Sequence, residues 1–239
     1  MRFFWALSSD SVTPMGKTKK PSPGKSTIPP TVVCFVRHGH TPTTGSILPG
    51  RAKGLHLSDK GSDQALAVAN NLAEYGKISA IYSSPMERTR ETAQHVARAC
   101  GLKTRIRKGL IEADFGTWTG EKLSALRKLP EWESVQKTPS NFRFPAGESF
   151  LEIQSRMVDA VSQIVEDHPG EVVVAVSHAD TIKTVISAAL GTPLDLFQRI
   201  HISPCSLSAV LYSLSGPTVL AVNTTGEKLQ SLIPMPAST

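Results

Sequence analysis

The sequence lacks the features that define zinc-binding or redox cysteine motifs, disulfide-rich proteins and membrane-spanning proteins. It has only three cysteines in 239 residues, at positions 34, 100 and 205, and none has the C-x-x-C spacing of a zinc ribbon or a redox motif. Their odd number also argues against a disulfide framework. No apolar run approaches the roughly 20 residues that cross a bilayer. We therefore predict a cytoplasmic protein that does not contact a membrane.

Net charge is small outside the first thirty residues. The chain has 26 Lys and Arg against 20 Asp and Glu, a net charge of +6 and a pI of about 9.3. Most of this excess lies in residues 1–30, which contain five basic residues and one acidic residue. Since the remainder is nearly neutral, nucleic acid is not expected as a partner. Residues 1–30 are also rich in Ser, Thr, Pro, Lys and Gly, which predicts a flexible basic tail.

Short apolar runs alternate with helical patterns from residue 31 onward. Strands are predicted at 31–36, 78–82, 103–107, 172–176, 206–212 and 218–222. Helices are predicted at 58–75, 84–100, 149–168 and 179–190. This alternation is typical of an α/β fold, a three-layer sandwich with a mostly parallel central sheet and helices on both faces. We expect this domain to span residues 31–225 and a C-terminal tail to follow at 226–239.

Two of the predicted strands end in similar polar segments. Arg37-His38-Gly39 follows the first strand, and Ser177-His178-Ala179 follows the strand at 172–176. The carboxyl ends of central strands in such a sheet open into one crevice, so the two histidines are expected to face each other there. Gly39 would let an anion approach backbone N–H groups, and the helix that begins near Ala179 would direct its own N–H groups to the same place. An anion is the expected ligand.

Arg88 adds a third group to this crevice. It lies in the first turn of the helix that Ser84-Pro85 is expected to open, where a cation is unfavourable by up to about 1 kcal/mol. Together with Arg37 it offers two planar guanidinium groups that can bind phosphate oxygens in pairs. The alternative is that Arg88 forms an ion pair with Glu87, Glu91 or another surface acid.

Five segments, in order along residues 31–212, resemble the motifs of the histidine phosphatase superfamily, also called the phosphoglycerate-mutase-like family. Arg37-His38-Gly39 resembles the first motif and Ser177-His178-Ala179 the third. The other matching segments are Ser83-Ser84-Pro85 with Arg88 and Thr92-Ala93, Leu110-Ile111-Glu112 with Phe115-Gly116-Thr117-Trp118-Thr119-Gly120, and Gly147-Glu148-Ser149. Arg37-His38-Gly39 alone would be common by chance, but all five segments in order are not.

The resemblance implies a phosphatase that needs no metal and no organic cofactor. His38 would attack phosphorus and become phosphohistidine, and Glu112 would first protonate the leaving oxygen and then activate water. Phe115 and Trp118 would raise the pKa of Glu112 by partial desolvation. The charge of the phosphate would be neutralised by Arg37, Arg88 and His178, with further phosphate-binding groups at Thr41, Thr44 and Ala179.

Two positions depart from the family pattern and leave the substrate open. His40 stands where many members have Glu, and Thr44 stands where Asn is common. Only 26 residues separate Gly120 from Gly147, whereas glycolytic mutases of this family have a longer segment that excludes water. We therefore predict hydrolysis of small phosphorylated metabolites.

Several other interpretations stay open at this point. A phosphomutase is the main alternative. A metal-dependent hydrolase could use the H-x-H spacing of His38 and His40, with His178 and Asp180 as further ligands. Arg37 and Arg88 would be unfavourable beside a cation. A non-catalytic module that binds a phosphorylated ligand is the third. Three loop residues, Arg51, Lys53 and His56, would either touch the substrate or be exposed to solvent, and a homodimer is left open.

Overall fold

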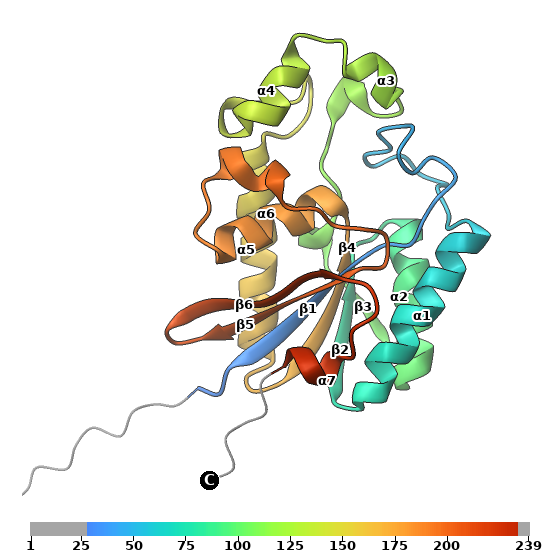
Figure 1. Ribbon diagram of the computed structural model, residues 1–239, viewed down its shortest axis with the longest axis vertical. Helices are drawn as coiled ribbons and strands as arrows, with labels where there is room; N and C mark the ends of the chain where they lie inside the picture. The colour runs from blue at the N-terminus through green and yellow to red at the C-terminus, as the bar shows by residue number, and fades with distance from the viewer. Residues whose placement is uncertain (1–27, 234–239) are drawn as a thin grey trace, which may run out of the picture.

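Six strands form one sheet in the computed structural model, which describes residues 28–233. They are β1 (Thr31–Arg37), β2 (Ile78–Ser83), β3 (Thr104–Ile106), β4 (Val172–Ser177), β5 (Leu207–Ser213) and β6 (Gly216–Thr224). Their order across the sheet is β3-β2-β4-β1-β5-β6 (Figure 1). The first four in sequence run parallel to one another, and β5 pairs antiparallel with both β1 and β6. The prediction of a mostly parallel sheet is confirmed.

The register between β1 and β4 places the two polar segments side by side. The pairing runs from Val32 opposite Val172 to Arg37 opposite Ser177. The next residues, His38 and His178, therefore leave the sheet at the same level on its carboxyl edge. The backbone N–H of His38 also donates to the carbonyl of Ser177 at 3.0 Å. The carboxyl ends of β1 and β4 therefore lie next to each other, where the crevice is predicted.

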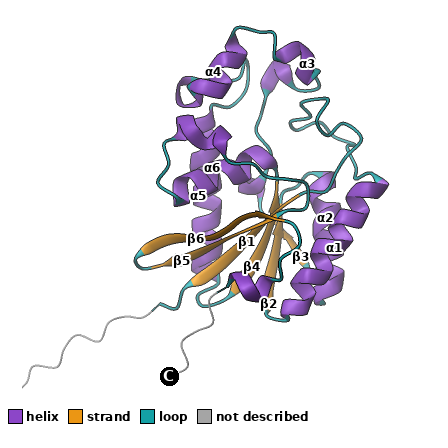
Figure 2. Ribbon diagram, in the orientation of Figure 1, coloured by secondary structure: helices purple, strands orange, loops and turns teal. Residues whose placement is uncertain are grey.

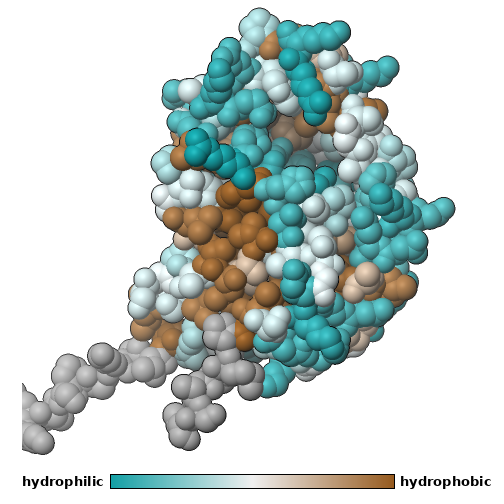
Figure 3. Space-filling view, viewed as in Figure 1, coloured by the Kyte–Doolittle hydropathy of each residue, from teal (hydrophilic) through white to brown (hydrophobic). Residues whose placement is uncertain are grey.

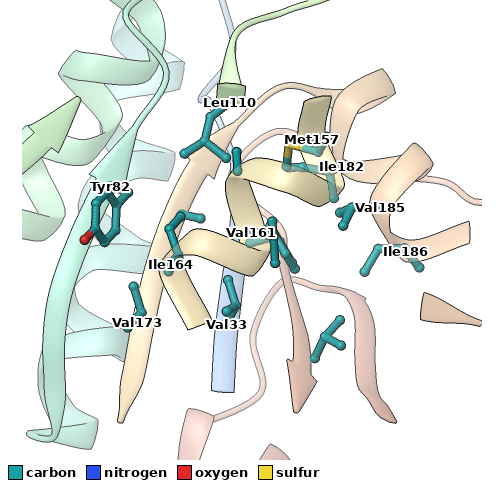
Figure 4. Packing of buried hydrophobic residues seen from close by; sticks show 14 of the residues in the cluster. Val33, Tyr82, Leu110, Met157, Val161, Ile164, Val173, Ile182, Val185 and Ile186 are labelled. Carbon is teal, nitrogen blue, oxygen red and sulfur yellow. The ribbon is translucent and has the colours of Figure 1, made fainter. Parts of the chain in front are cut away.

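Helices cover both faces of the sheet, as Figures 1 and 2 show. One face carries α1 (Asp59–Tyr75) and α2 (Glu87–Cys100), and the other carries α5 (Phe150–Asp167) and α6 (Ala179–Ala189). Successive side chains of β1 alternate between the two cores, as the period of a strand requires. Val33, labelled in Figure 4, packs with α5 and α6, and Phe35 belongs to the same core. Val32, Cys34 and Val36 pack with α1 and α2. Burial on both faces explains why β1 is a continuous apolar run.

Helix ends follow the sequence signals in α1 and α5 but not in α2. Ser58 caps α1 by accepting from the N–H of Gly61, and Ser149 forms a capping box with Glu152 at the start of α5. The Ser84-Pro85 pair does not open α2 as predicted. That helix begins at Glu87, and the Ser84 hydroxyl contacts the ring of His178 instead.

Between β3 and α5 the chain leaves the sheet and builds an aromatic cluster. This segment contains three single 3-10 turns as well as α3 (Leu123–Leu126) and α4 (Glu131–Lys137), which lie at the top of Figure 1. A further 3-10 helix, Leu194–Arg199, follows α6 and contributes to the same cluster. The aromatic members of the cluster are Phe115, Trp118, Phe142, Phe144, Phe150 and Phe197. Much of the small aromatic content of the protein is thus collected next to the carboxyl edge of the sheet.

The C-terminal end of the described chain corrects one sequence prediction. A short helix, α7 (Leu229–Leu232), lies within the segment assigned to a tail at 226–239. Leu229 is fully buried in the core beside α1, and its N–H donates to the side chain of Asn71 at 3.2 Å. A helix of four residues is too short to leave a periodic pattern in the sequence. Most of the predicted tail at 1–30 falls outside the described residues.

Figure 3 shows that hydrophobic residues gather on one side of this face of the molecule, over the β5–β6 hairpin and α6. Hydrophilic residues cover the side formed by α1 and α2. Among residues 28–233, no helix is both long enough and apolar enough to cross a membrane.

Candidate active site

A cavity of about 240 Å³ opens at the carboxyl ends of β1 and β4. The predicted site residues that line it are Arg37, His38, Thr41, Thr44, Glu112 and Ala179. The two others, Arg88 and His178, are fully buried beside it. The rings of His38 and His178 have centroids 5.3 Å apart, and Arg88 donates to His178. The structure therefore brings all eight predicted residues together.

His38 is held in the form of a neutral imidazole. Its Nδ1 lies 2.8 Å from the carbonyl oxygen of Gly39. Since a carbonyl only accepts, we assign the proton to Nδ1, which leaves the lone pair on Nε2. Burial, followed by the charges of Arg88 and Arg37, lowers the pKa of His38 well below its ordinary value. A side chain that is 5% exposed, neutral and fixed at Nδ1 can act as a nucleophile through Nε2.

Gly39 serves a different purpose from the one predicted. Its N–H donates to the hydroxyl of Thr92 at 3.0 Å, so this group is not free to bind an anion. A Cβ at Gly39 would lie 2.4 Å from the carbonyl oxygen of Gly61. The glycine is required because the backbone after β1 passes directly over the first turn of α1.

His178 is neutral as well, and both of its ring nitrogens are engaged. Arg88 donates from Nη2 to Nδ1 at 3.2 Å, so Nδ1 accepts and Nε2 carries the hydrogen. Nε2 lies 2.8 Å from the hydroxyl of Ser84, which accepts this hydrogen. Burial, and then the charges of Arg88 and His38, lower the pKa of His178 well below its ordinary value. In this arrangement His178 orients Arg88.

Arg88 has hydrogen-bond capacity that the described residues do not use. Its side chain is fully buried, and it is within ion-pair distance of no carboxylate in residues 28–233. Nη2 donates to the carbonyl of Gly50 at 2.9 Å and to His178, whereas Nε and Nη1 have no partner. The predicted alternative, an ion pair with Glu87, Glu91 or another surface acid, is therefore wrong for the described residues. Glu87 and Glu91 accept from the N–H groups of Gly54 and Leu57.

Arg37 is also incompletely bonded. Its Nη1 donates to the carbonyl of Ile202 at 2.7 Å, and its Nε is buried without a partner among the described residues. Buried N–H groups without acceptors are costly, particularly on a charged group. The unpaired donors of Arg37 and Arg88 therefore fit an anion with several oxygens, such as phosphate.

Glu112 has the properties of a general acid. It is 6% exposed, and one of its oxygens accepts from the N–H of Ala113 at 2.9 Å while the other lies 3.7 Å from Nδ1 of His178. Burial, followed by the nearby carboxylate of Asp180, raises its pKa to about 7, against the opposing charge of Arg88. Phe115 lines the cavity with it, as predicted, whereas Trp118 lies within the aromatic cluster.

Thr41 and Thr44 close a tight turn at the edge of the cavity. The hydroxyl of Thr44 accepts from the N–H of Thr41 at 2.9 Å, and the two hydroxyl oxygens are 3.0 Å apart. Thr41 is 2% exposed and Thr44 is half-buried. The hydroxyl of Thr44 thus holds this turn.

Several residues that line the cavity were not predicted as part of a phosphate site. Asp180, Lys183, His201 and Ile202 line the cavity, and Lys183 contacts Asp180 at 3.3 Å. Asp180 and Lys183 follow His178 by two and five residues on α6, a spacing that could have indicated them. No sequence signal marks His201 or Ile202, because they come from a loop after the 3-10 helix at 194–199.

The three loop residues and the second histidine lie away from the cavity. Arg51 donates to the carbonyl of Glu112, His56 pairs with Glu91, and Lys53 is exposed. The ring of His40 contacts the hydroxyl of Ser58 at 3.1 Å, outside the residues that line the cavity. His38 and His40 therefore do not form the H-x-H metal site considered above. In residues 28–233, no group of three His, Cys, Asp or Glu side chains could hold a metal ion.

Sequence relatives of this protein include a bifunctional protein and a probable phosphoglycerate mutase. The chain is 32% identical over 199 residues to the bifunctional protein Rv2228c of Mycobacterium tuberculosis, an alignment that covers 82% of this chain and 55% of that protein. The chain thus spans about half the length of that relative. It is also 32% identical over 185 residues to the probable phosphoglycerate mutase GpmB of Escherichia fergusonii, covering 77% of this chain and 86% of that one.

Solved structures share the fold. YhfR of Bacillus stearothermophilus superposes with a TM-score of 0.75 at 27% identity, over 80% of this chain and 96% of that one. A mycobacterial glucosyl-3-phosphoglycerate phosphatase superposes with a TM-score of 0.74 at 22% identity, over 82% and 99%. A phosphoserine phosphatase of Entamoeba histolytica does so with a TM-score of 0.73 at 23% identity, over 82% and 98%.

The family model for the histidine phosphatase superfamily (branch 1) matches residues 33–225. This range includes every residue of the cavity described above. Because the match covers most of the chain, including both strand ends that carry the histidines, the protein belongs to branch 1 of the histidine phosphatase superfamily.

Proposed function

We propose that this protein hydrolyses phosphomonoesters of small metabolites through a phosphohistidine on His38, with Glu112 as general acid and base. The observation that carries the proposal is the state of His38, whose Nδ1 is fixed by the carbonyl of Gly39 and whose pKa is lowered. The same cavity contains Glu112, a carboxyl group with a pKa of about 7. A nucleophile that is neutral and an acid that keeps its proton near neutral pH are what the first step needs.

In the first step, the Nε2 lone pair of His38 forms a bond to phosphorus while the ester P–O bond breaks. The leaving oxygen takes the proton of Glu112, so an alcohol departs rather than an alkoxide. Nδ1 keeps its hydrogen and donates it to Gly39, which supports the positive charge of the phosphorylated ring. The unpaired N–H groups of Arg37 and Arg88 would bind the phosphate oxygens, because these are the buried donors without a partner.

In the second step, Glu112 acts as a carboxylate. It takes a proton from a water molecule, whose oxygen attacks phosphorus as the P–N bond breaks. The electron pair of that bond returns to Nε2, and inorganic phosphate leaves with the water oxygen. Glu112 is again protonated and His38 is again neutral. A carboxyl group whose pKa lies near the working pH can serve both steps.

The loop after β1 supplies a matched pair of variants for testing this function. We expect His38→Ala to lose at least about a thousandfold in phosphate release from a panel of small phosphomonoesters. His40→Ala should keep activity close to that of the unmodified protein, because the ring of His40 bonds to Ser58 outside the cavity. Equal loss in both variants, or no loss in His38→Ala, would refute the nucleophile.

A phosphomutase is the second candidate, because a relative of 32% identity bears the name probable phosphoglycerate mutase. The two activities differ in the acceptor of the phosphoryl group. Phosphorus NMR of a reaction with a phosphorylated hydroxy acid distinguishes them, since hydrolysis gives inorganic phosphate and a mutase gives an isomeric ester. We expect inorganic phosphate.

Two further predictions concern the surroundings of the protein. Homodimer formation and residence in the cytoplasm both stay predictions.

A further inference from the structure

Arg51 holds the backbone of Glu112 although it does not line the cavity. Its Nε donates to the carbonyl oxygen of Glu112 at 2.9 Å. Its Nη1 and Nη2 contact the carboxylates of Asp114 and Glu148 at 3.3 and 2.9 Å. All three guanidinium nitrogens are thus bound to the segment that carries the proposed acid or to the turn before α5. This many charge-assisted bonds on one side chain give it a defined position.

Arg156 of α5 binds the same carbonyl. Its Nη2 donates to the oxygen of Glu112 at 3.1 Å, and its Nη1 donates to the carbonyls of Gly109 and Ile111. Glu148 lies between the two arginines and accepts from Arg156 at 2.8 and 3.0 Å. The carbonyl of Glu112 therefore accepts from two arginines that share one carboxylate.

We propose that Arg51 is a positioning residue for proton transfer, which acts through the carbonyl of Glu112 to fix its carboxyl group against the leaving oxygen. This inference rests on the proposed role of Glu112. Arg156 contributes to the same position, but it also bonds to two other carbonyls and supports the chain before Glu112. Arg51 lies on a surface loop with its side chain 31% exposed, so its removal tests the positioning separately from the fold.

The loop that carries Arg51 also reaches the phosphate-binding side of the cavity. The carbonyl of Gly50 accepts from Nη2 of Arg88 at 2.9 Å. Leu48 exchanges backbone bonds with the segment that follows Trp118, through Glu121 and Gly120 at 2.9 and 2.8 Å. In Figure 1 this loop runs alongside the chain that leads into α3. Consecutive residues therefore hold an arginine of the phosphate site and the backbone of the acid.

Substrates with different leaving groups provide the test. An alkyl phosphate needs its leaving oxygen protonated, whereas 2,4-dinitrophenyl phosphate releases a stable phenolate without help. We compare kcat/KM, which reports the first step, for both substrates in Arg51→Ala, Arg51→Lys and the unmodified protein. Lys53→Ala is the control, since Lys53 is an exposed cation of the same loop.

We expect Arg51→Ala to lower kcat/KM for the alkyl phosphate by about 10- to 100-fold and for the dinitrophenyl ester by less than about threefold. Arg51→Lys should recover part of the loss, because lysine can still donate to one oxygen. Lys53→Ala should change neither substrate. Equal losses for both substrates in Arg51→Ala would overturn the positioning role and indicate a general structural effect.

The positioning role and the proposed function fail differently. If the unmodified protein forms no phosphohistidine with the dinitrophenyl ester, the function itself is wrong. If it does and Arg51→Ala hydrolyses both esters at the unmodified rate, only the role of Arg51 is wrong. A urea unfolding curve of Arg51→Ala close to that of the unmodified protein confirms that the comparison concerns folded enzyme.

Discussion

The raised pKa of Glu112 makes the stability of this protein depend on pH in a direction that can be measured. A carboxyl group whose pKa is raised on folding binds its proton more tightly in the folded state than in the unfolded chain. The proton on Glu112 therefore contributes its full stabilisation of the folded state below about pH 4.5. This contribution to the free energy of unfolding is lost as pH rises to about 7. Above this range the folded state contains a buried carboxylate.

The size of the effect follows from the two pKa values. The change from 4.5 to about 7 corresponds to about 3 kcal/mol, at about 1.4 kcal/mol per pKa unit. Glu112→Gln removes this dependence of stability on pH, because an amide does not titrate. The amide keeps the shape of the protonated acid and can still accept from the N–H of Ala113. We expect the free energy of unfolding of Glu112→Gln, relative to the unmodified protein, to increase by roughly 2–3 kcal/mol between pH 5 and pH 8.

Urea unfolding curves of both proteins at pH 5, 6, 7 and 8 measure this difference directly. In the difference between the two proteins, the contributions of the histidines and of other shared titrating groups to the free energy of unfolding cancel. A difference that stays constant from pH 5 to pH 8, or that falls, would refute the raised pKa. The same substitution should abolish hydrolysis of alkyl phosphates at every pH, so the variant gains stability as it loses its acid.

Two more predictions concern the backbone and the phosphate site. Gly39→Ala should destabilise the protein by about 1–3 kcal/mol in urea unfolding, because its Cβ would collide with the backbone of Gly61. Gly226→Ala is the control with open space around it, and equal stability of the two variants would contradict the close approach. Inorganic phosphate at a hundred times its Kd should stabilise the unmodified protein by about 2.7 kcal/mol in thermal unfolding at matched ionic strength. Arg88→Met should lose most of this stabilisation, and an undiminished response would show that Arg88 does not bind the anion.

The sequence predicts much of this fold because the central strands are buried on both faces. A continuous apolar run such as Val172 to Val176 is typical of a central strand that is buried on both faces. Because β1 and β4 pair in parallel, the polar residues that follow them lie together at the carboxyl edge of the sheet. The starts of α1 and α5 can also be predicted, because a capping residue acts within the first turn of its own helix. Local signals thus place His38 and His178 side by side.

Other parts of the site depend on contacts between distant residues, and these have no local signal. Arg51 contacts Glu112 across 61 positions of the chain, so nothing near Arg51 reveals that it holds an acid. Gly39 is similar, because its purpose is set by Gly61 on a different element. Ser84 is typical of a helix cap, but its hydroxyl bonds to the buried ring of His178 and to the N–H of Met86, and α2 begins only at Glu87. Tertiary contacts override local preference at these positions.

The most direct test of the central claim is to trap the phosphorylated enzyme. The protein is mixed with excess dinitrophenyl phosphate, quenched rapidly in alkali, where phosphohistidine survives, and mapped by peptide mass spectrometry. We expect one phosphoryl group on the peptide that contains His38, with fragmentation that assigns it to this residue, and loss of the label in acid. Turnover without any phosphorylated peptide, or a phosphoryl group on another residue such as His40, would contradict it.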